Sequence, residues 1–209
     1  SRSGSEWLRN GTLAPADGVA GDGFGETLAM SSWVEPGLIN TEFLFVAAPG
    51  RSAGQGAVYV YRRDAGVWNL IATQVANDGA SNDAFGSALS VNTYSTGLEY
   101  AVGAPGKDGD SGAAYVFRKN AGGSNEWAQV DKVEANNRGG GDAFGSSVGF
   151  AGDVLAVGAP SEDSSINGVV NFNNNDAFDD NDDVEGSGAV YTFSRTTDEP
   201  NFLLQAYLK

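Results

Sequence analysis

The chain has 209 residues, of which 41% are hydrophobic and 11% aromatic, enough apolar material to bury a core in one or two domains. Twelve basic against 27 acidic residues give a net charge of −15, which argues against nucleic acid and anionic lipid as partners because both need a basic face. The chain contains no cysteine and no histidine, so disulfides, thiol nucleophiles and Ser/His/Asp constellations are excluded. No apolar run approaches the ~18 residues of a membrane helix, so we expect no membrane insertion.

The first predicted element is a short strand over residues 6–13, an alternating run opened by Trp7. Similar runs open with an aromatic residue at Trp68, Trp127 and Phe202. The distance from a tryptophan to the following Phe-Gly pair is 17 residues in all three cases, at Phe24, Phe85 and Phe144. A constant spacing of this kind indicates an internal repeat.

Two further anchors follow each Phe-Gly pair in a fixed order. They are an apolar run ending in Ala-Pro, at Pro49, Pro105 and Pro160, and the motif Gly-Ala-x-Tyr, from Gly56, Gly112 and Gly188. Each repeat thus holds four short β-type runs separated by glycine, asparagine and aspartate. We therefore predict an all-β chain, a single β-propeller segment over residues 1–209, with repeats at 17–75, 78–133 and 142–208. Each repeat is expected to form a blade of four antiparallel strands that buries its faces against its neighbours.

These anchors resemble the FG-GAP repeat of integrin α-subunits and of many bacterial surface and secreted proteins. The likeness runs from about Trp7 to Leu208, and the lead-in "DGASNDAFG" from Asp78 is similar to the bacterial branch. The resemblance implies a β-propeller in a secreted or surface-bound bacterial protein, with ligands bound at the loop face. It does not carry over integrin-type calcium sites, because the segments between first and second strands, such as "NTYSTGLE", lack carboxylates at alternate positions.

The third repeat carries an acidic insert over residues 161–187. The interval from the Ala-Pro proline to the next Gly-Ala glycine is 7 residues in the first two repeats and 28 in the third. Calcium takes about six to eight oxygen ligands, and oxygen-bearing side chains at alternate positions curl around such an ion. Four of these metal-ligand candidates are Asp179, Asn181, Asp183 and Glu185, and three neighbouring ligand-binding candidates are Asp176, Asp180 and Asp182. The pattern predicts either a calcium site or a solvated acidic loop.

The loops leading into each Phe-Gly pair offer further candidates, Asp17, Asp22, Asp78, Asp83 and Asp142. Aspartate before glycine is ordinary turn chemistry, in which the carboxylate accepts backbone N–H bonds, and we favour this role over metal or ligand contact. Trp33, in the predicted loop "SSWVEPGLINTE", is a candidate platform for a glycan, although a tryptophan folded back on its own blade is the commoner arrangement. We expect the lead-in loops and the insert on one face of the propeller, the recognition surface.

The residues argue against catalysis. Histidine, the commonest general base, is missing, and no carboxylate pair stands out from the turn aspartates, so the chain is predicted not to be an enzyme. We expect a noncatalytic recognition or adhesion module, extracellular or on the cell surface, that binds a protein or glycan, with calcium as its cofactor. The alternatives are a structural, self-assembling propeller subunit and an accessory domain of a larger secreted protein.

The number of repeats predicts a partner for the blades themselves. Three blades are fewer than the roughly four to eight of a closed propeller. The strand over residues 6–13 is of the fourth type and is surplus, because no inner strands precede it. We therefore expect either self-association or the remainder of a larger propeller to cover the terminal blades.

Overall fold

The computed structural model describes residues 2–3, 6–7, 11–34, 40–94, 97–121, 126–165, 168–171, 184–196 and 201–209, with only the backbone for residues 2–3, 6–7 and 94. The regular secondary structure of the described residues is mostly antiparallel β-sheet, as predicted. Its only helical segments are two single turns of four residues, α1 (Arg51–Gly54) and α2 (Lys107–Asp110). Both contain residues with positive φ, such as Ser52 at 54°, so they are tight connections between strands and not regular helices.

Apart from a two-stranded hairpin at residues 2–7, the strands of the described chain form three sheets in sequence order. Sheet 1 consists of β3 (Leu28–Val34), β4 (Asn40–Ala48), β5 (Ala57–Asp64) and β6 (Val67–Gln74). Sheet 2 consists of β7 (Ala88–Tyr94), β8 (Gly97–Ala104), β9 (Ala113–Lys119) and β10 (Trp127–Val133). Sheet 3 has β11 (Ser147–Ala151), β12 (Val154–Ala159), β14 (Ala189–Ser194) and β15 (Leu203–Leu208), with β13 (Val169–Asn171) added beyond β15.

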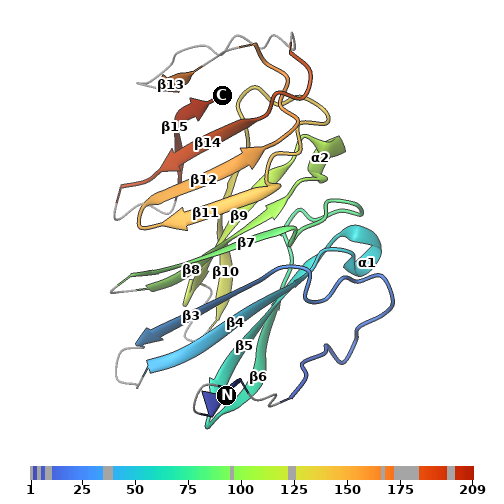
Figure 1. The fold of residues 1–209 in the computed structure, drawn as a ribbon, viewed down its shortest axis with the longest axis vertical. Helices are drawn as coiled ribbons and strands as arrows, with labels where there is room; N and C mark the ends of the chain where they lie inside the picture. Colours follow the sequence, from blue (N-terminus) through green and yellow to red (C-terminus); the bar gives the residue numbers. More distant parts are fainter. Residues whose placement is uncertain are drawn as a thin grey trace.

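The three sheets stack face to face along the long axis of the molecule (Figure 1). Their first strands, β3, β7 and β11, lie against one another in that order. The stack is open, because none of the described sheets closes on itself. This is the blade-like arrangement that the four runs per repeat predict, in a β-propeller-like array.

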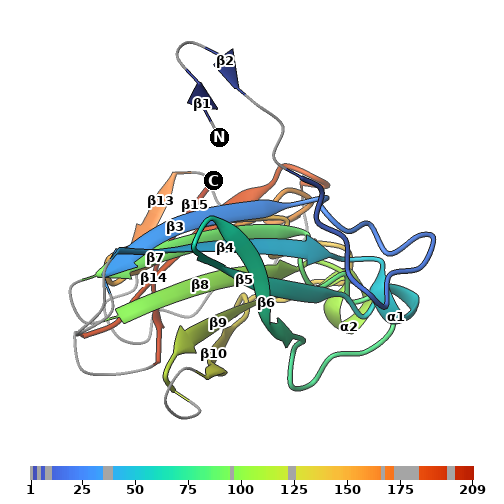
Figure 2. The ribbon, with the colours of Figure 1, turned by 90° about the horizontal axis from the view of Figure 1, so that it is seen from below.

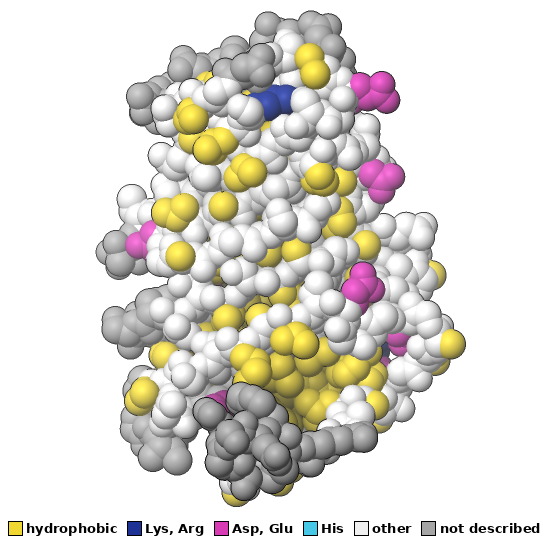
Figure 3. Space-filling model, in the orientation of Figure 1, with side chains coloured by type: hydrophobic (Ala, Val, Ile, Leu, Met, Phe, Trp, Pro, Cys, Tyr) yellow, Lys and Arg dark blue, Asp and Glu magenta, His cyan; other side chains and the backbone are white. Residues whose placement is uncertain are grey.

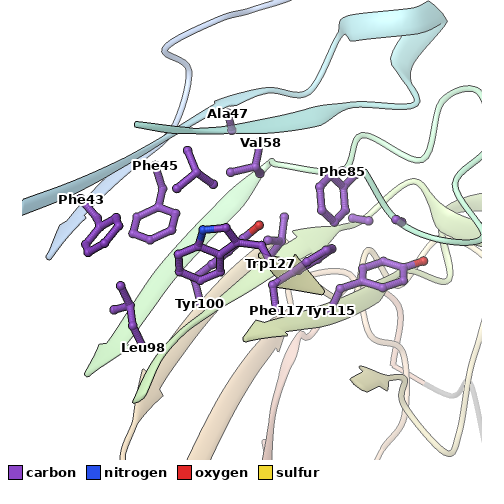
Figure 4. Packing of buried hydrophobic residues seen from close by; sticks show 14 of the residues in the cluster. Phe43, Phe45, Ala47, Val58, Phe85, Leu98, Tyr100, Tyr115, Phe117 and Trp127 are labelled. Atoms are coloured by element: carbon purple, nitrogen blue, oxygen red, sulfur yellow. The ribbon is translucent and has the colours of Figure 1, made fainter. Parts of the chain in front are cut away.

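The interface between sheets 1 and 2 is an aromatic core (Figure 4). Phe43 and Phe45 of β4 point toward Tyr100 of β8 and Trp127 of β10, and the Phe45 and Tyr100 ring centroids are 4.8 Å apart. Tyr100 also stacks on Phe117, with 5.1 Å between ring centroids and 9° between their planes. The alternation of each strand supplies one face to each neighbouring sheet, so β8, which has a sheet on either side, is buried along both faces.

The interface between sheets 2 and 3 adds a buried ion pair to its apolar core. The Glu99 side chain of β8 is 0% exposed and that of Arg195, just after β14, is 3% exposed, with 2.6 Å between Arg195 Nη2 and Glu99 Oε2. Arg195 Nη1 donates a second hydrogen bond to Glu99, and the guanidinium lies over the Phe202 ring at 4.7 Å. The two residues are 96 positions apart in sequence. Because Glu99 lies in sheet 2 and Arg195 follows β14 of sheet 3, their pairing helps to set how sheet 3 packs on sheet 2.

The N-terminal segment is shorter than the predicted strand over residues 6–13. Of this range the structure describes residues 6–7, which form β2 (Glu6–Trp7) and pair with β1 (Arg2–Ser3), and residues 11–13, which belong to no strand. Figure 2 shows this hairpin standing away from the three sheets. A fourth-type strand needs a third-type strand as its neighbour, and β5, β9 and β14 already pair with β6, β10 and β15.

Candidate functional site

The loops of the three repeats gather at one end of the sheets, the loop end, together with α1 and α2 (Figures 1 and 2). In each repeat the connection from the second to the third strand is bonded to the lead-in loop. The N–H of Gly50 donates to Asp22 O at 3.0 Å, that of Gly106 to Asp83 O at 3.1 Å, and that of Ser161 to Asp142 O at 3.3 Å. The acidic insert begins in this same connection of sheet 3, so its described base lies at the loop end, as predicted.

Three of the lead-in aspartates have a structural role. Asp22, Asp83 and Asp142 are at most 5% exposed. Each carboxylate accepts the backbone N–H three residues earlier, from Val19 at 2.9 Å, Ala80 at 2.7 Å and Gly139 at 2.6 Å. This is the turn chemistry favoured from the sequence, and it directs these oxygens inward instead of toward a ligand.

The other lead-in position binds the tyrosine of the Gly-Ala-x-Tyr motif. The Tyr59 hydroxyl donates to Asp17 at 3.3 Å, that of Tyr115 to Asp78 at 2.8 Å, and that of Tyr191 to Asn137 at 2.8 Å. The residue two positions after each Ala-Pro completes the set, and it is Arg51, Lys107 or Glu162. Where the lead-in residue is aspartate its partner is a cation, and where it is asparagine its partner is a glutamate.

The charges of this set are balanced internally in sheet 2. Burial raises the pKa of Asp78, but hydrogen bonds from Lys132 and Tyr115 outweigh burial and lower it below its usual range. Lys107, 7% exposed at its side chain, donates to Asp83 at 3.2 Å and to Asp78 O at 2.7 Å. Sequence analysis missed the residues after Ala-Pro. The signal is visible in the three repeats, because the change from a cation to a glutamate at this position accompanies the change from aspartate to asparagine at the lead-in position. The set ties the lead-in loops to the connections between the second and third strands.

The two ends of the acidic insert are hydrogen-bonded to each other, and we call these paired ends, Glu162–Asp163 and Val184–Gly188, the neck. Asp163 O accepts the N–H of Val184 at 2.8 Å, and its carboxylate accepts the N–H of Gly186 at 2.6 Å. Glu162 O accepts the N–H of Gly188 at 3.0 Å. Between the two sides of the neck, β13 pairs with β15 and extends the outer edge of sheet 3. The insert is therefore anchored to sheet 3 at both its ends and along one strand.

The predicted calcium ligands are only partly described. Glu185 lies exposed in the neck, whereas Asp179, Asn181 and Asp183, and with them Asp176, Asp180 and Asp182, lie outside the described residues. In the part of the chain that the structure describes, no three acidic side chains come together in a way that would hold a metal ion. Calcium binding by the insert therefore stays a prediction.

Trp33 is placed differently from its prediction. It lies in β3, not in a loop, because β3 extends to Val34 and pairs Trp33 with Thr41 of β4. Its side chain is 6% exposed and belongs to the core between sheets 1 and 2, with Lys119 Nζ 5.6 Å from its ring centroid. The even positions of β3 face outward and the odd ones face sheet 2, so Trp33 offers no exposed ring on which a sugar stacks.

The repeated Phe-Gly and Gly-Ala motifs contact each other between successive sheets, and we call this contact a joint. Gly56 of sheet 1 forms an isolated parallel bridge with Phe85 of the next repeat, and Gly112 does so with Phe144. A Cβ on Gly56 or Gly112 would lie 2.0 Å from the carbonyl oxygen of that phenylalanine, and both glycines have positive φ. Only glycine fits there, which explains why the two phrases recur together.

Residues 68–117 and 127–171 match the family model of the FG-GAP repeat. The chain therefore contains FG-GAP repeats. The two matches begin in β6 and at the start of β10, so the family's unit joins the outer strand of one sheet to the first strands of the next. FG-GAP repeats form a noncatalytic family of binding and structural repeats, typically extracellular. A comparison with curated proteins gives no match. No helix among the described residues is long and apolar enough to cross a membrane.

Proposed function

We propose that the chain is a noncatalytic recognition or adhesion module of a secreted or surface-bound bacterial protein, and that it binds a protein or glycan through the loop end. The acidic insert carries this proposal. It holds eight of the 27 acidic residues of the chain and no basic residue, on a connection that takes only six residues in the other repeats. A long insert in an otherwise economical repeat is more often functional than a short turn.

Calcium is the cofactor we propose for this end of the molecule. The eight acidic residues of the insert repel one another unless a cation neutralises them, and carboxylate and amide oxygens are the ligands that calcium prefers. The fixed neck brings Asp163 and Glu185 to the base of the run that contains Asp179, Asn181 and Asp183. A bound ion would neutralise these carboxylates and give a ligand a defined surface.

The test replaces the insert by the short connection of sheet 2. In this loop-swap chain, residues 161–187 give way to "GKDGDS", residues 106–111, which join the same Ala-Pro and Gly-Ala phrases. Calorimetric titration with calcium chloride, and melting with calcium or chelator, compare the wild type with the loop-swap chain and with Asp179→Asn/Asp183→Asn. A ligand present at a hundredfold its dissociation constant stabilises the folded state by about 2.7 kcal/mol, and only the wild type should show this.

The matched control is Asp108→Asn/Asp110→Asn, which removes two carboxylates from α2 at the same end of the molecule. It should bind calcium like the wild type. Equal titrations for the wild type and the loop-swap chain would rule out a calcium site in the insert. Recognition itself is measured on a glycan array in the presence of calcium, where the loop-swap chain should lose whatever binding the wild type shows.

A second function is favoured by a different observation. Apolar side chains are exposed on the outer faces of sheets 1 and 3, among them Met30 and Val190. These faces support the alternative of a structural, self-assembling subunit. An accessory domain attached to a larger secreted protein would use the same loop end.

A further inference from the structure

A hydrogen bond ties the fourth strand of sheet 2 to that of sheet 3, and the same bond cannot form between sheets 1 and 2. Asp131 of β10 accepts the backbone N–H of Phe202, just before β15, at 2.6 Å. The repeats place Ala72 of β6 where sheet 2 has Asp131, and Trp127 where sheet 3 has Phe202. Alanine has no acceptor side chain, so sheets 1 and 2 lack this bond.

A groove of about 300 Å³ opens where this bond is missing. Its walls come from β6 of sheet 1 and from the start of β10 in sheet 2, and they are Ile71, Ala72, Thr73, Gln74, Glu126 and Trp127. The Gln74 side chain reaches across it and donates to Trp127 O over 3.5 Å, a long hydrogen bond. The groove lies between two neighbouring sheets of the chain, so no face at the start or end of the chain contributes to it.

Trp127 brings a buried polar atom without a partner to this groove. Its side chain is 7% exposed, and its indole N–H has no hydrogen-bond partner among the described residues. The hydroxyl of the fully buried Tyr100 also lacks a partner there, and the two ring centroids are 5.3 Å apart. In sheet 3 the same two positions hold Phe202 and Leu155, which carry no polar side-chain atom. An unpartnered buried donor is costly, so an acceptor that a ligand brought to Trp127 would be favourable.

The charges around the groove indicate a neutral ligand. The strand β6 carries no charged residue, and Figure 3 shows hydrophobic side chains gathered over the sheet 1 end of the molecule. Glu126 is the only charged residue among the described ones that line the groove. One carboxylate is too few to hold a metal ion, and in a chain of net charge −15 it disfavours an anionic ligand.

The size and the polar groups of the groove match one sugar ring. Its volume of about 300 Å³ is at the lower end for ligand pockets, enough for one ring but not for several residues of an extended peptide. Ile71, 36% exposed, and Ala72 supply an apolar strip, as the C–H face of a sugar requires. Thr73, Gln74 and Glu126 supply a hydroxyl, an amide and a carboxylate, which together donate to and accept from sugar hydroxyls.

We propose that the groove between β6 and β10 binds a neutral hexose unit. Hydroxyl groups of the sugar donate to the Glu126 carboxylate, and a sugar oxygen accepts the indole N–H of Trp127. A single ring makes few contacts, so its binding is weak. This inference does not rest on recognition by the loop end, because the groove and the acidic insert share no residue.

The test follows the indole N–H signals of the four tryptophans by proton–nitrogen NMR while a sugar is added to the 209-residue chain. The neutral probes are galactose, glucose, mannose and N-acetylglucosamine, and glucuronic acid is the anionic comparison. Trp127→Phe assigns the Trp127 signal and places in sheet 2 the residue that sheet 3 has at this position. At least one neutral sugar should shift the Trp127 signal to saturation, whereas glucuronic acid should leave it in place.

Ala72→Asp copies the arrangement of Asp131 and should fill the groove. It should weaken sugar binding about tenfold or more, and so should Trp127→Phe, with binding measured by saturation-transfer NMR on the sugar. Val67→Asp is the matched control, because it adds the same charge to β6 at a position that is 61% exposed and does not line the groove. This control should bind the sugar like the wild type. Circular dichroism checks that each variant keeps its β-sheet, and Ala72→Asn replaces Ala72→Asp if that variant fails to fold.

The loop-swap chain separates this groove from the loop end. With chelator present it should bind the free sugar like the wild type, whereas the washed glycan array reads the tighter binding proposed for the loop end. Loss of the sugar shift in the loop-swap chain would place the sugar in the insert and overturn the proposal. No shift with any neutral sugar would also overturn it, as would equal binding of glucuronic acid or binding that survives Ala72→Asp. A shift caused by a short neutral alanine peptide and by no sugar would assign the groove to a protein partner instead.

Discussion

The ion pair between Glu99 and Arg195 gives the sharpest test of what holds sheets 2 and 3 together. Glu99→Gln keeps the shape of the side chain and removes its charge, which leaves the Arg195 guanidinium buried. Asp153, 44% exposed and 3.2 Å from Arg195 Nε, stays as an acidic partner. Breaking a buried pair by removing one member costs about 3–5 kcal/mol, and we expect the lower end of that range because Asp153 remains.

The double variant Glu99→Leu/Arg195→Met should cost less than Glu99→Gln alone. Replacing both members of a buried pair by apolar residues is often neutral, because no buried charge is left without a partner. The two charges that lose a partner here are partly exposed, Arg118 at 30% and Asp153 at 44%. The repeats supply independent support, since the position of Glu99 is held by Phe43 in sheet 1 and by Val154 in sheet 3. An apolar residue at this point of the second strand is therefore compatible with the sheet.

The assay is equilibrium unfolding in urea, followed by tryptophan fluorescence at one fixed protein concentration. Glu42→Gln is the matched control, because its pair with Arg63 is 2.6 Å long but 42% and 33% exposed. Exposed pairs contribute about 0–1 kcal/mol, so this variant should change the free energy of unfolding very little. The reasoning fails if Glu99→Gln costs no more than Glu42→Gln, or if the double variant costs the sum of its single changes.

Two further predictions concern the tyrosines and the joints. Burial and the Glu162 carboxylate raise the pKa of Tyr191 far above its usual range, and burial raises the pKa of Tyr207 to about 12. A raised tyrosine pKa gives stability that is complete below pH ~10 and is lost as pH rises through the folded value, so absorbance titration at 295 nm should show delayed ionisation that coincides with unfolding. Gly112→Ala meets Phe144 O at 2.0 Å, whereas Gly66→Ala has nearly the same positive φ and nothing within 4 Å. Gly66→Ala should cost about 1 kcal/mol, and Gly112→Ala should cost several times more; equal melting temperatures would refute the joint.

The sequence predicted the repeated part of the fold well, because each repeat carries its own signals. The Ala-Pro and Gly-Ala phrases mark the connection between second and third strands, and the structure places α1 and α2 at these points. The turn role of Asp83 was also predicted, since an aspartate three residues after its backbone donor is a local feature. Local patterns of this kind are visible in a single sequence.

Features that depend on distant or short segments were not predictable. The sequence around Glu99 does not predict its pairing with Arg195, 96 residues away, because a pair across two sheets leaves no local pattern. The strand β13 has only three residues, and its partner β15 lies beyond the acidic run. The strand predicted over residues 6–13 does not include residues 11–13, since alternation is a local signal but a strand also needs a neighbouring strand to pair with along its length.

The residues that differ between repeats favour one order of the sheets in the stack. All joints use the same glycine and phenylalanine, so the joint alone would let any sheet follow any other. The cation that ends each third strand differs in what it meets on the preceding sheet: Lys119 lies 6.0 Å from the Phe43 ring centroid, and Arg195 pairs with Glu99. A sheet 3 placed after sheet 1 would bring Arg195 to Phe43, so its guanidinium would lose the buried carboxylate of Glu99. The repeated motifs thus form the contacts common to the whole stack, and residues that occur in one repeat only, such as Glu99 and Arg195, favour the observed order of the sheets.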